Sequence, residues 1–174
     1  MLMAKVSAEA RFALAMSATP EEAMRKMNES LSHMNLDRFV TVALCLLDQD
    51  SGSLTVVNAG HMPPMIRRSD GVVETVAVEE SGVPIGIVPD YPYEGFVTTL
   101  NAGDVVLLYT DGINEAMNAE DEQLTSEAIL EELRQCPIKT AHGIGDQICK
   151  LVNQHVGFRP PIDDICMVCI GREA

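Results

Sequence analysis

The chain has 174 residues, of which 47% are hydrophobic, and its formal net charge at pH 7 is −14. This length fits one domain with a sizeable core, and the apolar content excludes a disordered chain. The negative charge excludes a nucleic-acid binder, which needs clustered Lys and Arg, and argues against adhesion to an anionic membrane surface. An anionic substrate could bind only where a metal ion locally reverses the field.

The first residues and the cysteines indicate a cytoplasmic protein. No apolar run is long enough to span a bilayer, and Glu9 and Arg11 interrupt any signal-peptide core near the N-terminus. The five cysteines are an odd number and are scattered along the chain. This usage favours reduced thiols, and we expect cytoplasmic localisation without a membrane segment.

In chain order, the pattern first predicts two helices. One covers residues 2–17, and the second runs from Pro20 to about Met34. Thr19 can cap the second helix, and Pro20 suits its first position. Ala23, Met27 and Leu31 should share its buried face.

Three hairpins are predicted next, each with turn residues between two apolar or β-branched runs. The paired runs are 39–47 with 54–59, 65–68 with 72–78, and 96–100 with 105–109. Helical patterns follow at 124–135 and 139–156, and the last strand is 165–170. Because hairpin follows hairpin and the helices flank the strands, we expect an α+β layered fold with a mainly antiparallel sheet, in a single domain over residues 1–174.

Acidic residues stand at the ends of two of these strands. Asp111 and Gly112 follow the buried run 105–109, and Asp163 and Asp164 precede the last strand. Carboxylates brought together repel one another unless a cation lies between them, and hard oxygen ligands select Mg²⁺, Mn²⁺ or Ca²⁺. The alternative is that Asp111 caps a helix beginning near Ile113 and that the later pair forms a turn.

Two further motifs allow a chemical and a structural interpretation. His61, in a Gly- and Pro-rich loop, could be a ligand or a general acid, or it could stabilise a turn, and Asn58 fits a loop-ordering residue. Cys166 and Cys169 have the spacing of a zinc pair. On a strand, residues three apart point to opposite faces, so we expect packed thiols instead.

Several segments, in order, resemble the bacterial sporulation-protein-E-type serine phosphatases of the metal-dependent PPM class, the type 2C protein phosphatases. The most specific is the run Tyr-Thr-Asp-Gly-Ile-Asn-Glu-Ala. The matching segments are 38–41, 52–64 with Asn-Ala-Gly-His-Met-Pro-Pro, 82–86, 108–116 and 163–165.

The resemblance implies a β-sandwich flanked by helical layers and hydrolysis of a phosphoserine or phosphothreonine by water held on a two-metal Mn²⁺ or Mg²⁺ centre. It implies that Asp111 and Asp163 are metal ligands and that Gly112 sets the turn. Asp164 would be a ligand or a group beside the metal. His61 falls in a family motif but is not one of its recognised ligands.

One departure from the family pattern limits this expectation. The family carries a Gly-Asp-(Val or Ile)-x-Gly-(His or Lys)-Gly segment whose Asp bridges the metals, and nothing in this sequence matches it. We expect an N-terminally truncated domain that lacks the first strands, holds at most one cation weakly and has little activity. Uncovered edges and apolar helix faces then predict a homodimer. The alternative is a natural pseudo-phosphatase, a non-enzymatic module that binds a partner protein.

The resemblance also suggests partners. Domains of this type act on a phosphorylated anti-sigma-factor antagonist and follow a sensory or receiver domain. A third hypothesis is a metal-dependent hydrolase of a small phosphate ester.

Overall fold

The computed structural model describes residues 2–33, 39–160 and 163–173, and the chain forms two compact units. Unit 1 comprises Met1–Pro63 and Ala77–Thr99, and unit 2 comprises Pro64–Val76 and Leu100–Ala174. Each unit has one antiparallel sheet with helices, which confirms the predicted α+β class. No helix in these described ranges is long and apolar enough to cross a bilayer.

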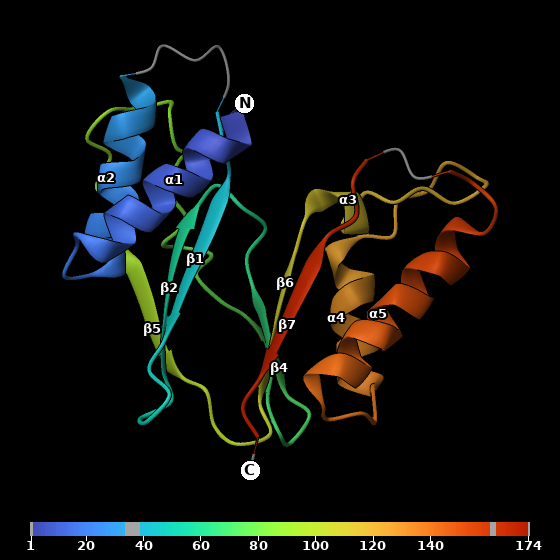
Figure 1. The fold of residues 1–174 in the computed structure, drawn as a ribbon. Coiled ribbons are helices and arrows are strands. Elements are labelled where there is room, and N and C mark those ends of the chain that lie inside the picture. Colours follow the sequence, from blue (N-terminus) through green and yellow to red (C-terminus); the bar gives the residue numbers. More distant parts are fainter. Residues whose placement is uncertain (1, 34–38, 161–162, 174) are drawn as a thin grey trace. The chain divides into compact units, whose positions relative to one another are not determined.

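Unit 1 packs two helices against a three-stranded sheet (Figure 1). The strands lie in the order β1-β2-β5, and α2 contacts both β1 and β2. The helices pack against each other. The elements are α1 (Leu2–Ala15), α2 (Pro20–Ser32), β1 (Val42–Leu47), β2 (Ser53–Ala59) and β5 (Gly95–Thr99).

Helix α2 begins as its sequence predicts. The Thr19 hydroxyl accepts a hydrogen bond from the Glu22 N–H at 3.2 Å, and Pro20 occupies the first turn. Ala23, Met27 and Leu31 are all buried, so the predicted apolar face is confirmed. The predicted end at Met34 lies outside the described residues, as does Arg38 of the first matching segment.

Unit 2 has a four-stranded antiparallel sheet in the order β4-β3-β6-β7 (Figure 1). Helix α4 contacts β3 and β4, α5 contacts β7, and the two helices contact each other. The elements are β3 (Met65–Arg67), β4 (Val73–Thr75), β6 (Val105–Tyr109), α3 (Asp111–Asn114), α4 (Ser126–Gln135), α5 (Ala141–Val156) and β7 (Met167–Gly171).

Two of the three predicted hairpins are confirmed, and the third is wrong. β1 pairs with β2, and β3 pairs with β4. The runs predicted as the third pair lie in different sheets, because β5 pairs with β2 whereas β6 pairs with β3 and β7. The turn at Asn101–Asp104 does form, with the Asp104 N–H donating to the Asn101 carbonyl at 3.0 Å, but the chain passes there from one sheet to the other.

The predicted packing of the two late cysteines is wrong for one of them. Cys166 is exposed and lies just before β7, which begins at Met167 rather than at residue 165 as predicted. Cys169 lies within β7, is half-buried, and burial raises the pKa of its thiol to about 11. Both thiols are free.

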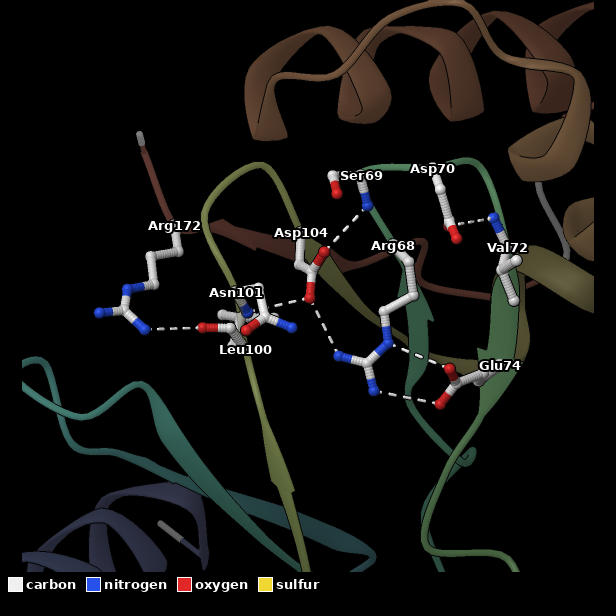
Figure 2. A network of polar contacts seen from close by, with 9 residues as sticks. All are labelled: Arg68, Ser69, Asp70, Val72, Glu74, Leu100, Asn101, Asp104 and Arg172. Carbon is white, nitrogen blue, oxygen red and sulfur yellow. Dashed lines mark hydrogen bonds and ion pairs between the residues drawn. The ribbon is translucent and has the colours of Figure 1, made fainter.

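The turn before β6 anchors a polar network (Figure 2). Asp104 is 1% exposed, and its carboxylate accepts hydrogen bonds from Arg68 Nη1 at 3.0 Å and from the N–H groups of Ser69 and Asn101, both at 2.9 Å. Arg68 also donates to both carboxylate oxygens of Glu74, each at 3.1 Å. Burial raises the pKa of Asp104, but the bonds from Asn101, Arg68 and Ser69 outweigh it, so the pKa lies below its ordinary value.

Candidate metal centre

The chain leaves β6 through Thr110, which is the N-cap residue of the short helix α3. Asp111 is the first residue of this helix and is exposed, and its Oδ1 accepts a hydrogen bond from the Gly112 N–H at 3.0 Å. The alternative that Asp111 is the helix cap is therefore wrong. The cap position belongs to Thr110, whose hydroxyl makes no capping bond.

The Thr110 hydroxyl is used instead to join the start of the last strand. It donates to the Asp164 carbonyl at 3.2 Å and accepts from the Cys166 N–H at 3.1 Å. The Thr110 N–H donates to the Cys166 carbonyl at 3.0 Å. These bonds hold residues 164–166 against the end of β6.

Gly112 permits a close approach between the same two segments. A Cβ atom at this position would overlap the Asp164 carbonyl oxygen, with the Asp164 carbonyl carbon 3.0 Å away. Any larger residue would push the two segments apart, because its Cβ cannot share the space that the Asp164 carbonyl occupies. The glycine after Asp111 thus has a steric reason in addition to its place in the turn.

Asp163 and Asp111 stand at the same end of the sheet. β6 and β7 are antiparallel, and Tyr109 at the end of β6 pairs with Met167 at the start of β7. Asp163 is exposed, and its Oδ1 accepts from the Asp164 N–H at 2.7 Å. Asp164 is also exposed, and its carbonyl takes the bond from Thr110. The structure thus brings together the acidic segments that the sequence pattern singled out.

The donor set suits a hard cation in type but is small in number. Carboxylate oxygens are the ligands that Mg²⁺ and Mn²⁺ prefer, and each of these acids engages only one oxygen with a neighbouring N–H. In the part of the chain that the structure describes, no group of three or more His, Cys, Asp or Glu side chains is placed to hold a metal ion. Two carboxylates would leave most positions around a cation to water.

Asn58 and His61 belong to unit 1, whereas the acids belong to unit 2. Asn58 is fully buried; its Nδ2 donates to the His61 carbonyl at 3.0 Å, and its Oδ1 accepts from the His61 N–H at 2.9 Å. The His61 ring Nδ1 lies 3.0 Å from the Met62 carbonyl. Gly60 has a positive φ of 67°, which favours glycine. These contacts order the loop around Asn58.

A cavity of about 150 Å³ opens beside Asp163 and Gly112 within unit 2. Its other walls come from the segment after α3, the end of α5 and the approach to β7, namely Glu115, Ala116, Met117, Val156, Pro160 and Ile165. Sequence reasoning assigned no role to Glu115. The one signal for it was its place in the run 108–116.

Comparisons of the amino-acid sequence with known proteins identify a family and several relatives. The family model described as Stage II sporulation protein E matches residues 1–173. Protein IcfG of Synechocystis is 25% identical over 152 residues, which is 86% of this chain and 24% of that protein. The phosphoserine phosphatase RsbU of Bacillus subtilis is 26% identical over 98 residues, 55% of this chain and 29% of RsbU. The chain therefore spans under a third of the length of these relatives.

Solved structures show the same fold. The PP2C phosphatase domain of the Bacillus subtilis cell fate determinant SpoIIE, solved with a fragment of its regulatory domain, has a TM-score of 0.80 and 22% identity, covering 95% of this chain and 48% of that one. The phosphatase domain of the same protein, solved after presoaking with manganese, has a TM-score of 0.68 and 20% identity, covering 97% and 73%. At these identities the likeness shows the fold, which confirms the expected PPM-type arrangement. The match to the family model over residues 1–173 places the chain in the Stage II sporulation protein E family, whose solved members have PP2C-type phosphatase domains.

Proposed function

We propose that the chain is part of the catalytic domain of a metal-dependent protein serine/threonine phosphatase. Its reaction would be hydrolysis of a phosphoserine or phosphothreonine on a bacterial regulatory protein. The observation that carries the proposal is the joining of the Asp111 and Asp163 segments through Thr110 at one end of the β6–β7 pair.

Asp111 and Asp163 would hold Mn²⁺ or Mg²⁺, with the manganese-presoaked neighbour supporting the choice of metal. When bound, such a cation lowers the pKa of a bound water and neutralises charge on phosphoryl oxygens. The Gly112 N–H orients the Asp111 carboxylate, and the Asp164 N–H does the same for Asp163. Both acids are exposed, which leaves them accessible to a residue on the surface of a protein substrate.

A complete two-metal centre needs a further bridging acid, and the sequence lacks the family's Gly-Asp segment that supplies it. We infer that these 174 residues bind at most one cation weakly and turn over a phosphoprotein slowly or not at all. The intact protein would carry that acid upstream, behind a sensory or receiver domain. Its substrate would be a phosphorylated anti-sigma-factor antagonist, and the chain would form a homodimer.

A second candidate is a non-enzymatic module that binds a partner protein through the same fold. The observation that favours it is the absence, among the described residues, of any group of three metal-ligating side chains. The two candidates differ in Mn²⁺ binding. The phosphatase requires that Asp111 and Asp163 bind Mn²⁺, whereas the partner-binding module does not.

Calorimetric titration with Mn²⁺ tests the metal site directly. We expect weak binding that Asp111→Asn and Asp163→Asn each reduce by about tenfold or more, because fewer carboxylates lower the affinity for a hard cation. Asp70→Asn is the matched control, since Asp70 is an exposed acid of unit 2 that likewise accepts a backbone N–H, from Val72 at 3.0 Å. Equal Mn²⁺ binding by all four proteins would contradict the assignment.

Activity is tested on a phosphoserine peptide with Mn²⁺, using this chain and a longer one that includes the genomic residues upstream of Met1. We expect turnover only from the longer chain. Rapid Mn²⁺-dependent turnover by the 174 residues would contradict the inferred need for a further acid. Absence of turnover from both chains would favour the partner-binding module.

A further inference from the structure

The cavity beside Asp163 combines two kinds of wall. Most of its lining residues are apolar, and two are acidic. The apolar residues are Ala116, Met117, Val156, Pro160 and Ile165, and the acids are Glu115 and Asp163. Among the described residues, none that lines it is a Lys or Arg. We name it the Glu115 cavity.

Its size suits a single side chain. A cavity of about 150 Å³ with apolar walls accommodates a group the size of benzene. A helix or strand of a partner would not enter such a volume, whereas one long side chain would. The volume therefore suits one residue of a polypeptide whose main chain stays outside.

The walls also define the chemistry of that residue. Lysine and arginine place an aliphatic stem along apolar surface while the cationic head stays near water and carboxylates. Arg159, which adjoins the lining residue Pro160, cannot serve as this cation from within, because it donates to Asp121 Oδ1 at 2.6 Å and to the Asn118 carbonyl at 2.7 Å. The net charge of −14 further favours a basic partner residue.

The cavity is continuous with the candidate metal centre, because Gly112 and Asp163 line it as well. A cation held by Asp163 would neutralise that carboxylate, so Glu115 is the acid left to pair with an incoming basic head group. A residue in the cavity would then lie a short distance along the substrate chain from the phosphorylated residue.

We propose that the Glu115 cavity binds a lysine or arginine side chain of the phosphoprotein substrate, close in sequence to the phosphorylated serine or threonine. This assignment rests on the proposed function, since it takes the Asp111 and Asp163 end of the sheet as the place of the phosphate. It adds a sequence preference that the metal centre alone would not give.

The test measures peptide binding rather than turnover, so it applies to the chain as it stands. Fluorescence polarisation compares labelled phosphoserine peptides, with Mn²⁺ present, in which arginine, lysine, norleucine, citrulline or glutamate is moved through the flanking positions. We expect arginine or lysine at one position to tighten binding about fivefold over norleucine and citrulline, as for a partly exposed ion pair. Equal or tighter binding of the norleucine peptide would overturn the proposal.

Two variants connect that preference to the cavity. Glu115 is exposed, so Glu115→Gln should leave the fold intact and remove the about fivefold preference for a cationic residue. Glu131→Gln is the matched control, because Glu131 is an exposed acid of the same unit that does not line the cavity. A preference that survives Glu115→Gln, or that Glu131→Gln removes equally, would overturn the proposal.

A phosphate-free measurement separates this proposal from the phosphatase function. Methyl NMR with Nα-acetyl-arginine amide should shift the signals of Ala116, Met117 and Ile165, and Glu115→Gln should reduce the shifts. Shifts together with equal binding of phosphorylated and unphosphorylated peptides would support the cavity and contradict the phosphatase function. Phosphate- and Mn²⁺-dependent binding without any basic preference would support the function and overturn the cavity assignment.

Discussion

Strand β6 has an aspartate beside each of its ends, Asp104 before Val105 and Asp111 two residues after Tyr109. Asp104 is 1% exposed and accepts hydrogen bonds from a guanidinium and two backbone N–H groups. Asp111 is exposed and accepts one bond, from the next residue along the chain. One end of β6 is thus flanked by the fully hydrogen-bonded carboxylate of Asp104. The other end is flanked by the Asp111 carboxylate, which has an oxygen available for a ligand.

The difference follows from the cost of burying charge. A buried carboxylate is tolerated only when a cation and hydrogen bonds replace its water, so Asp104 contributes to stability. An exposed carboxylate keeps its water and can exchange it for a ligand, so Asp111 and Asp163 remain available for binding. Substitutions at the two ends should therefore separate loss of stability from loss of binding.

The largest expected effect is at the buried end. Asp104→Asn keeps the size of the side chain but leaves Arg68 without its buried partner, and we expect the free energy of unfolding to fall by about 3 kcal/mol. Urea denaturation followed by circular dichroism measures it. Asp111→Asn is the counterpart at the other end and should change stability by less than about 0.5 kcal/mol. Equal losses from both variants would contradict the comparison.

The stability of the Asp111 end of β6 depends on close packing rather than on charge. Gly112→Ala puts a methyl group into the Asp164 carbonyl, and we expect a loss of about 2 kcal/mol as the 164–166 segment moves away. Gly145→Ala is the control, because its Cβ would lie 3.6 Å from Cys169 Sγ, an ordinary contact, and alanine favours the interior of α5 by about 1 kcal/mol. If both alanines stabilised the protein, the close approach at Gly112 would have no energetic weight.

Lowering the pH should also reduce the stabilisation that Asp104 provides. The loss should be smaller than in Asp104→Asn, because protonated Asp104 keeps both of its side-chain oxygens. Since the folded pKa of Asp104 is lowered, its contribution is complete above the unfolded pKa, about 3.9 for an aspartate, and is lost as pH falls through the folded value. Stability of the wild type should therefore fall more steeply below pH ~4 than that of Asp104→Asn. Urea denaturation at each pH gives the free energy of unfolding of both proteins. If it fell in parallel with pH for the wild type and Asp104→Asn, the stabilising role of ionised Asp104 would be contradicted.

Local signals in the sequence predicted much of the fold. The cap at Thr19, the face of α2 and the β1–β2 and β3–β4 hairpins depend on residues close together in the chain. The third hairpin was wrong because the strand partners of β5 and β6 are set by packing between distant segments, which turn residues do not encode.

The candidate site likewise combines features that residues close together in the chain predict with features that depend on distant segments. Asp111 and Asp163 each adjoin a predicted strand end, and antiparallel pairing brings those ends together. Their assignment as metal ligands came from the resemblance to the family. Glu115 stood in the matching run 108–116, but no role was assigned to it, since the proposed role depends on walls contributed by Val156 and Ile165, far along the chain. The pairing of Arg68 with Asp104 was missed for the same reason, although the turn that holds Asp104 was predicted.

The smallest expected effect is at the outer side of the Arg68 network. Glu74 makes two hydrogen bonds to Arg68, yet its side chain is 44% exposed, so water competes for both groups. We expect Glu74→Gln to cost about 0.5 kcal/mol, against about 3 kcal/mol for Asp104→Asn, although both remove a carboxylate from the same guanidinium.

A double-mutant cycle sharpens this contrast. In the Asp104→Asn background, Glu74 compensates more of the charge on Arg68, so Glu74→Gln should cost more there than in the wild type. Urea denaturation of the four proteins gives the coupling energy. If Glu74→Gln cost as much as Asp104→Asn in the wild type, with no coupling between them, burial could not be what distinguishes the two carboxylates. The availability of the Asp111 carboxylate for binding would then need an explanation other than its exposure.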